Sequence, residues 1–351
     1  MNSNTVYEAF SATCGKFGNH PFLHIPKNAA HYSTGSIDAS YQESLDKIDS
    51  LASNYKDAGY KIDSRIGLFL ENRIEFFHHW LALNKLGCSV IPLHPDMQSG
   101  EISYFLEHGE AALVVSLTYK KKELEDICAK IKNRPSVASA EEFPDVPTAK
   151  AKSEKNNLPS GSTECALLYT SGSTGKPKGC ILDNDYFLYA GHWYNTIGGL
   201  VEIKPGEERL LTPLPLNHMN AMACSSMAMI LSGGCIIQLD RFHPKTWWED
   251  VRSSGATILH YLKNDDEFSK NELVLIDFGV RWMTMHADIT RTVPASGRFN
   301  PLQKLLYEIV LKAQLEVEKA ARAGVTIQSL NDICWNSINL SLEDTFRSVG
   351  G

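Results

Sequence analysis

The sequence lacks the features that mark several classes of protein. Its eight cysteines never form a C-x-x-C pair, which argues against a zinc site or a disulfide framework and indicates reduced thiols in the cytoplasm. The N-terminus has no basic segment followed by an apolar core, so we predict no signal peptide. No run of lysine and arginine exceeds Lys120–Lys122, and the net charge is −7, which argues against nucleic acid as the main partner.

The sequence also lacks an uninterrupted apolar run long enough to cross a membrane. The stretch Met222–Leu239 comes nearest, but serines and the pair Gly233–Gly234 interrupt it. It therefore predicts a buried helix followed by a buried strand, and no membrane span. Hydrophobic residues make up 43% of 351 residues, which is enough for a sizeable core and suggests roughly two domains.

Helix and strand patterns alternate in the first half of the chain. The segment SYQESLDKIDSLASNYKDAG opens with a capping box at Ser40 and Glu43 and places its apolar residues on one helical face. Arg65–Leu70 is a short apolar strand, and SVIPLHP and AALVVSL are further buried strands. Continuous apolar strands separated by helices predict an α/β fold with a parallel sheet.

Two other regions have a different pattern. Between Lys120 and Glu164 the sequence is polar and without period, which predicts a surface loop or an insertion. After Glu267 two strand patterns are followed by one long helix that begins at Asn300 and Pro301, an α+β arrangement.

The glycine-rich segment LLYTSGSTGKPKG, residues 167–179, follows a short apolar strand. Its glycines bring backbone N–H groups close together, its hydroxyls add donors, and Lys176 and Lys178 add positive charge, which is the chemistry that a polyphosphate needs. It is not a Walker loop, because Pro177 stands five residues after Gly172 where that motif has glycine. The alternative is a flexible, polar surface loop.

The segment YTSGSTGKPKG resembles the phosphate-loop signature of the adenylate-forming superfamily, which includes acyl-CoA synthetases, peptide-synthetase adenylation domains and luciferases. The resemblance covers roughly residues 5 to 255 and is nearest to CoA ligases of the medium-size acid type or the carnitine type. It implies an adenylate-forming ligase core, with ATP phosphates held by Thr170, Ser171, Gly172, Ser173, Thr174, Gly175 and Lys178. It places His218 near the substrate carboxylate, whereas the residue pattern alone favours a hydrogen-bonded core histidine.

The same resemblance implies a two-step reaction. A small carboxylic acid reacts with ATP in the presence of Mg²⁺ to give an acyl-adenylate and pyrophosphate, and CoA then takes the acyl group. Positioning and charge neutralisation would carry the first step. We find no adenine-binding strand, hinge or lid lysine between Ile258 and Gly351, so we expect a truncated ligase with impaired activity.

From about Thr257 the chain resembles the pita-bread metallopeptidases, specifically aminopeptidase P and prolidase, over ILHYLKNDDEF, ELVLIDFG and HADITRTV. A strand, a turn and a return strand could bring Asp277 and Asp288 together as ligands for two Mn²⁺ ions. The resemblance gives His260 a role in contacting substrate. Taken singly, Asp277 is instead a turn former and Asp288 an exposed strand residue. The family site has five ligands, and two aspartates alone would hold a metal pair poorly.

These observations predict a ligase domain over residues 1–254 and a metallopeptidase-like half-domain over residues 255–351. Three functions remain open: an acyl-CoA ligase, an Xaa-Pro aminopeptidase, or a non-catalytic chimera produced by gene rearrangement or sequence misassembly. Because each part would lack packing partners, we expect exposed apolar surface around Met222–Leu239 and on the helix Leu302–Val317.

Overall fold

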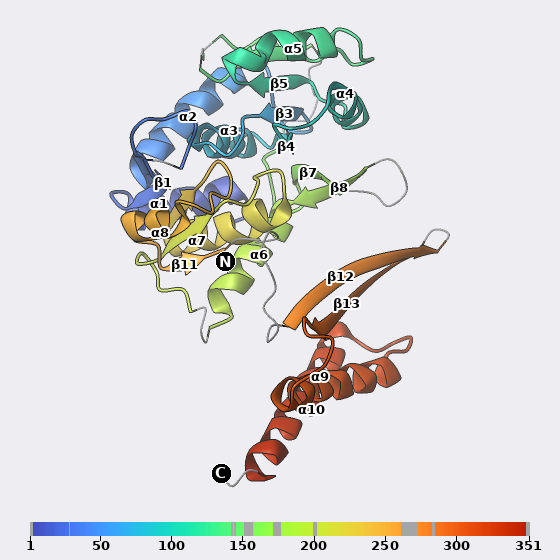
Figure 1. Ribbon diagram of the computed structural model, residues 1–351. Coiled ribbons are helices and arrows are strands. Elements are labelled where there is room, and N and C mark those ends of the chain that lie inside the picture. The colour runs from blue at the N-terminus through green and yellow to red at the C-terminus, as the bar shows by residue number, and fades with distance from the viewer. Residues whose placement is uncertain are drawn as a thin grey trace. The chain divides into compact units, whose positions relative to one another are not determined.

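The computed structural model describes residues 3–27, 29–141, 143, 145–150, 157–170, 177–198, 202–260, 273–282 and 285–348. The chain divides into two compact units, Met1–Leu262 and Lys263–Gly351. Each unit is an α/β structure with its own sheets and helices (Figure 1). The boundary predicted between residues 254 and 255 stays a prediction.

The first unit contains a six-stranded sheet in the order β6-β5-β3-β4-β7-β8. Its strands are β3 (Arg65–Phe69), β4 (Ser89–Pro92), β5 (Leu113–Ser116), β6 (Ser136–Ser139), β7 (Glu164–Thr170) and β8 (Lys178–Asp183). All neighbours are parallel except β7 and β8, which form an antiparallel hairpin. The parallel sheet predicted from the apolar strand runs is confirmed.

A second sheet of five strands has the order β11-β9-β10-β1-β2. Its strands are β1 (Pro21–Ile25), β2 (Ile37–Ser40), β9 (Arg209–Thr212), β10 (Cys235–Gln238) and β11 (Ile258–Leu259). Only β2 is antiparallel to its neighbour, so four carboxyl ends emerge along one edge of this sheet.

One continuous core lies between the two sheets and includes side chains from both of them. The helices that contribute to it are α1 (Val6–Phe17), α2 (Tyr41–Asp57), α3 (Ile74–Lys85), α6 (Asn184–Thr196) and α7 (Ser226–Ser232). Every residue of α3 from Phe76 to Asn84 is buried, as expected for a helix enclosed between two layers. Helices α4 (Ser99–His108) and α5 (Thr118–Cys128) cover the outer face of the six-stranded sheet, and α8 (Trp247–Ser254) covers the outer face of the other.

Two local predictions have different outcomes. Helix α2 begins with the predicted capping box, in which Ser40 and Glu43 bond each other's backbone N–H groups. The predicted loop between Lys120 and Glu164 is partly wrong, since it contains the end of α5 and the whole of β6. Strand β6 is an edge strand of the sheet and pairs only with β5. Its backbone hydrogen bonds define it as a strand, whereas its sequence has no continuous apolar run that would have predicted one.

The expectation of exposed apolar surface around Met222–Leu239 is wrong. Every residue of this segment except Leu231 is buried, in the π-helix η2 (Asn220–Ser225), α7 and β10. Helices α1 and α6 pack against α7, and the Tyr41 hydroxyl lies within hydrogen-bonding distance of the backbone carbonyls of Met229 and Gly234, at 2.9 and 2.8 Å. The predicted order of a buried helix and then a buried strand is confirmed by α7 and β10. The segment is not exposed because the elements that cover it all belong to the first unit.

The second unit consists of a long hairpin, β12 (Leu273–Trp282) and β13 (Met285–Pro294), and two helices, α9 (Pro301–Ala320) and α10 (Ile327–Ser348). Asn300 caps α9 with Pro301 in its first turn, as predicted. Leu302 is 63% exposed and Val310 59% exposed, which confirms the expected apolar surface on this helix. Within the described part of the chain, no helix combines the length and apolar character that a membrane crossing requires.

Candidate functional site

The hairpin β7–β8 carries the two ends of the predicted phosphate loop. Thr170 and Lys178 form the last backbone pair of the hairpin, so both stand where the loop leaves it. The loop itself, residues 171–176, lies outside the described residues. The structure thus brings together the first and last of the predicted phosphate ligands at the backbone level.

The end of this hairpin that carries the loop is fixed to helix α4. The ring of Tyr169 stacks on Phe105 with centroids 3.9 Å apart, and its hydroxyl is hydrogen-bonded to Nδ1 of His108 at 2.8 Å. Tyr104 donates a hydrogen bond from its hydroxyl to the carbonyl of Pro177 at 3.0 Å, just before β8. Gly179 lies so close to Leu167 that a Cβ there would stand 2.9 Å from a leucine methyl group. Both ends of the loop therefore leave a rigid support, which limits the entropy lost when a ligand is bound.

His218 follows the carboxyl end of β9, in a segment with prolines at 213 and 215. Its side chain is exposed, and its Nδ1 accepts a weak hydrogen bond from the backbone N–H of Asn220 at 3.4 Å. The hypothesis of a core histidine is therefore wrong. The π-helix η2 starts two residues later, and such helices occur frequently at functional sites.

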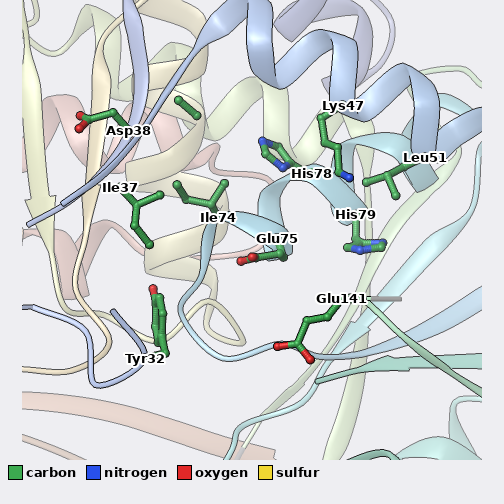
Figure 2. A pocket seen from close by; sticks show the side chains of 12 residues that line it. Tyr32, Ile37, Asp38, Lys47, Leu51, Ile74, Glu75, His78, His79 and Glu141 are labelled. Carbon is green, nitrogen blue, oxygen red and sulfur yellow. The ribbon is translucent and has the colours of Figure 1, made fainter. Parts of the chain in front are cut away.

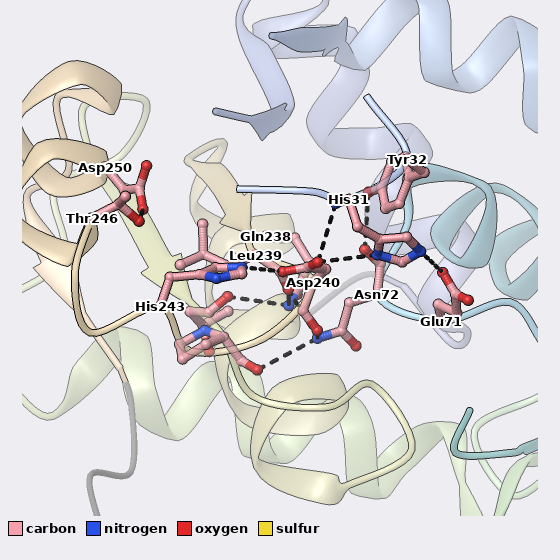
Figure 3. A network of polar contacts seen from close by, with 12 residues as sticks. His31, Tyr32, Glu71, Asn72, Gln238, Leu239, Asp240, His243, Thr246 and Asp250 are labelled. Atoms are coloured by element: carbon pink, nitrogen blue, oxygen red, sulfur yellow. Dashed lines mark hydrogen bonds and ion pairs between the residues drawn. The ribbon is translucent and has the colours of Figure 1, made fainter. Parts of the chain in front are cut away.

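Asn72 holds the segment before His218 in place, although the sequence did not single it out. This buried residue follows β3, and its Nδ2 lies 3.1 Å from the carbonyl oxygen of Leu214 and 3.0 Å from that of Leu239 (Figure 3). Its Oδ1 accepts a hydrogen bond from the N–H of Leu216 at 3.0 Å. A polar residue directly after a buried strand was the available signal.

Asp240, after β10, is the centre of a second polar network. Its side chain is 6% exposed and is bonded to Nε2 of His243 at 2.5 Å and to Nδ1 of His31 at 3.1 Å (Figure 3). Burial raises the pKa of Asp240, but hydrogen bonds from both histidines outweigh this and leave its pKa below the usual value. Nε2 of His31 also lies 3.7 Å from the buried carboxylate of Glu71, which follows β3. The network thus connects the carboxyl ends of the two sheets.

A cavity of about 370 Å³ lies at this junction and is lined by His31, Glu71, His94, Asp96, Tyr119 and Asp240, among others. Strand β3 leads through α3 to β4 on one side, whereas β5 leads through α5 to β6 on the other. The carboxyl ends of β3 and β5 therefore flank a topological switch point, where open α/β sheets bind ligands. The hydroxyl of Tyr119 bridges the two ends by donating a hydrogen bond to Glu71.

His260 lies in the first unit, directly after β11. Its backbone N–H donates to the carbonyl of Leu211 in β9 at 3.0 Å, and its Nδ1 is 2.5 Å from the hydroxyl of Ser225. Burial lowers the pKa of His260 below the usual histidine value. All of these contacts of His260 are with residues of the first unit.

Asp277 and Asp288 lie on the two strands of the hairpin in the second unit. Asp277 pairs with Thr290 and Asp288 pairs with Gly279, so the aspartates are two positions apart in the ladder. That offset places both positions on the same face of the hairpin. Among the described residues, no group of three or more histidine, cysteine and acidic side chains could hold a metal ion.

Comparison with curated proteins shows similarity to CoA ligases over part of the chain. The chain is 24% identical over 231 residues to a crotonobetaine/carnitine–CoA ligase of Citrobacter koseri. It is 23% identical over 231 residues to the enzyme of the same name from Escherichia coli. In both cases the match covers 62% of this chain and 44% of the relative, so the chain spans less than half the length of these curated relatives.

Solved structures share the fold. The N-terminal domain of FACL13 from Mycobacterium tuberculosis matches with a TM-score of 0.60 and 17% identity, over 73% of this chain and 62% of that one. The O-succinylbenzoate coenzyme A synthetase MenE of Bacillus subtilis, in complex with ATP and magnesium ion, matches with a TM-score of 0.58 and 16% identity, over 72% and 62%. The first unit therefore has the fold of the N-terminal part of adenylate-forming ligases.

Family profiles match both parts of the chain. The profile of metallopeptidase family M24 matches residues 250–350 and accounts for the sequence resemblance of the tail. The profile of the AMP-binding enzyme family matches residues 11–262, well over half of the chain. The chain belongs to the AMP-binding enzyme family.

Proposed function

We propose that the first unit activates a small carboxylic acid with ATP and Mg²⁺ and passes the acyl group to CoA. The observation that carries this proposal is the hairpin β7–β8, which presents Thr170 and Lys178 at the two ends of the signature loop. A carboxylate oxygen of the acid attacks the α-phosphorus of ATP, the bond to the β-phosphate breaks, and pyrophosphate leaves. CoA thiolate then attacks the acyl carbon, and AMP leaves.

Each site residue that the ligase resemblance implies has a place in this proposal. The backbone and hydroxyl groups of residues 170–175, with the ammonium of Lys178, would surround the phosphates and stabilise the charge that develops on them. His218 is exposed at the end of β9 and would meet the acid. The cavity of about 370 Å³ lined by Glu71 and Asp240 would hold a portion of the bound substrates.

The proposal is tested by acid-dependent exchange of pyrophosphate into ATP, measured on the full chain. Acids to be screened are carnitine, crotonobetaine, O-succinylbenzoate and a long-chain fatty acid. Lys178→Met is expected to lower the exchange rate about 10- to 100-fold, because one cation that neutralises the phosphates is lost. Lys56→Met, on the exposed face of α2, is the matched control and should exchange like the wild type.

A folded chain that binds no ATP and shows no exchange with any of these acids would overturn the proposal. A Lys178→Met variant with wild-type exchange would overturn the assigned role of the loop. Thermal unfolding of both lysine variants shows whether a lost activity reflects a lost fold.

Two observations favour the aminopeptidase alternative: the metallopeptidase profile match over residues 250–350, and the register that places Asp277 and Asp288 on one face of the hairpin. Release of the N-terminal residue from an X-Pro peptide in the presence of Mn²⁺ tests it. Release that disappears in Asp277→Asn would assign the activity to the tail. His260 would belong to that site only if His260→Gln abolished the same release.

We propose that the segment shared by the two family matches, residues 250–262, is the junction of two ancestral sequences. Within it, Thr257 and His260 are bonded to β9 of the first unit. Sequencing the transcript across codons 250 to 265 tests whether the junction is expressed.

All eight cysteines are free thiols, and six are buried, which supports a reducing cytoplasmic location as a proposal.

A further inference from the structure

A second cavity in the first unit has no part in the proposed ligase site. It measures about 400 Å³, within the usual range for small-molecule sites. Its walls come from β2, α2, the first half of α3 and the segment after β6 (Figure 2). Neither Thr170, Lys178 nor His218 lines it.

Two buried histidines form one wall of this cavity. Nε2 of His78 is 3.2 Å from the hydroxyl of Ser44, and Nδ1 of His79 is 2.7 Å from the hydroxyl of Tyr55. Burial lowers the pKa of His78 to about 4 and that of His79 to about 3. Both imidazoles are therefore neutral near pH 7, and Nε2 of His79 has no hydrogen-bond partner among the described residues.

Carboxylates face the cavity from two other elements. Glu75 lies one turn before the histidines on α3, is half-buried, and makes no hydrogen bond or ion pair with the described part of the chain. Glu141, an exposed residue of the segment after β6, also lines the cavity (Figure 2) and accepts hydrogen bonds from Thr118, whose N–H lies at 2.8 Å. Asp38 also lines the cavity but is paired with His24 at 2.7 Å. Neither Glu75 nor Glu141 forms an ion pair with a described residue, although the charge of Arg73 contributes, after the hydrogen bonds from Thr118, to the lowered pKa of Glu141.

One cation stands at another part of the lining. Lys47 projects from α2 toward the histidines (Figure 2), and its charge contributes to the low pKa of both. It makes no ion pair with Glu75, Glu141 or any other described residue. Apolar surface from Ile37, Leu51 and Ile74 lies around these groups. Separated charges of opposite sign, with apolar walls, are complementary to a ligand that carries both charges on a short hydrocarbon.

We propose that this cavity binds a small zwitterion, with its primary ammonium at Glu75 and Glu141, its carboxylate at Lys47, and its methylene groups against Leu51 and Ile74. A metal ion is the weaker candidate, since no three-ligand group occurs among the described residues. The neutral imidazoles neither repel the ammonium nor compete with it for the carboxylates. Nε2 of His79 remains available for a hydrogen bond to either end of the ligand.

Isothermal titration calorimetry on the full chain with three matched probes tests the proposal. The probes are 6-aminohexanoate, hexylamine and hexanoate, which share a carbon chain and differ in charge. We expect 6-aminohexanoate to bind about tenfold or more tightly than either singly charged probe, because only it forms both charge-assisted contacts.

Two substitutions should separate the two ends of the ligand. Glu75→Gln is expected to weaken the binding of 6-aminohexanoate and of hexylamine about tenfold and to leave the affinity for hexanoate unchanged. Lys47→Met should weaken the binding of 6-aminohexanoate by a similar factor and leave the affinity for hexylamine unchanged. Glu125→Gln, on the exposed face of α5, is the matched control and should bind all three probes like the wild type.

The inference is overturned if 6-aminohexanoate gives no binding signal, or if its affinity is the same in both cavity variants as in the wild type. Equal affinity for hexanoate and 6-aminohexanoate would also overturn it, since it would show that the ammonium is not recognised. Should Glu75→Gln fail to fold, Glu141→Gln tests the same end of the ligand. Loss of pyrophosphate exchange in Lys178→Met has no bearing on these outcomes.

Discussion

Replacing Asn72 with aspartate is expected to destabilise the first unit by about 3–5 kcal/mol, the usual cost of an uncompensated buried charge. The carboxamide Nδ2 of Asn72 has the carbonyl oxygens of residues 213, 214, 239 and 240 within 3.0–3.4 Å. A carboxylate has no N–H to offer them, so aspartate would place a negative charge against four partial negative charges (Figure 3). The residue is 7% exposed, so water cannot take over these contacts.

Urea unfolding at pH 7 measures this effect as a shift of the transition midpoint. Asn72→Asp should also increase proteolysis of the segment before His218, because Asn72 holds the backbone of that segment from both sides. Asn19→Asp, at an exposed position, makes the same chemical change without burial and is the control. Equal midpoints for the two variants would contradict the assigned role of Asn72.

The sequence predicted the first unit well where a local pattern determines the structure. The capping box at Ser40 specifies the start of α2, and the apolar runs specify the parallel strands, because burial on both faces requires apolar residues at every position. Composition singled out the glycine-rich segment 167–179, and Thr170 and Lys178 within it form the last backbone pair of a hairpin. These features depend on residues close together in the sequence.

The contacts that the sequence did not reveal join residues far apart in the chain. Asn72 bonds to residues more than 140 positions later, and His31 meets Asp240 across 209 positions. Nothing in the local pattern of either segment specifies its partner. The expectation of exposed apolar surface around Met222–Leu239 was wrong for the same reason, since the segment is covered by α1, α6 and Tyr41.

The pair His78–His79 illustrates a further limit. In the sequence it is a polar interruption of an apolar helix, and exposure would be the simple interpretation. In the structure α3 is enclosed between two sheets, so both imidazoles are buried and each is bonded to a hydroxyl of α2. The burial of α3 between two sheets determines the protonation state of His78 and His79, and no local sequence pattern predicts that burial.

Acid is therefore expected to destabilise the protein steeply between about pH 6.5 and pH 4. In the unfolded chain each histidine binds a proton near its ordinary pKa of 6.5, whereas in the folded chain the pKa values are about 4 and about 3. The folded state is thus favoured above pH 6.5, and this contribution is lost as the pH falls, because only the unfolded state takes up the protons. Two such protons change the free energy of unfolding by about 2.7 kcal/mol per pH unit within this window.

Two variants separate titration from hydrogen bonding in urea unfolding curves recorded between pH 7 and pH 4.5. His79→Gln removes one titrating group and should reduce by about half the part of the slope that His78 and His79 contribute, while His260, whose pKa burial also lowers, contributes equally in both proteins. Tyr55→Phe removes the hydroxyl bonded to His79 but leaves both imidazoles buried, so it should lower stability at every pH and retain the slope. The bonded carboxylate of Asp240 has a lowered pKa, and its contribution is lost only below the ordinary aspartate value of 3.8, outside this window. A wild-type slope that His79→Gln leaves unchanged would show that these histidines are protonated in the folded protein, which would also place positive charge beside the proposed ammonium site.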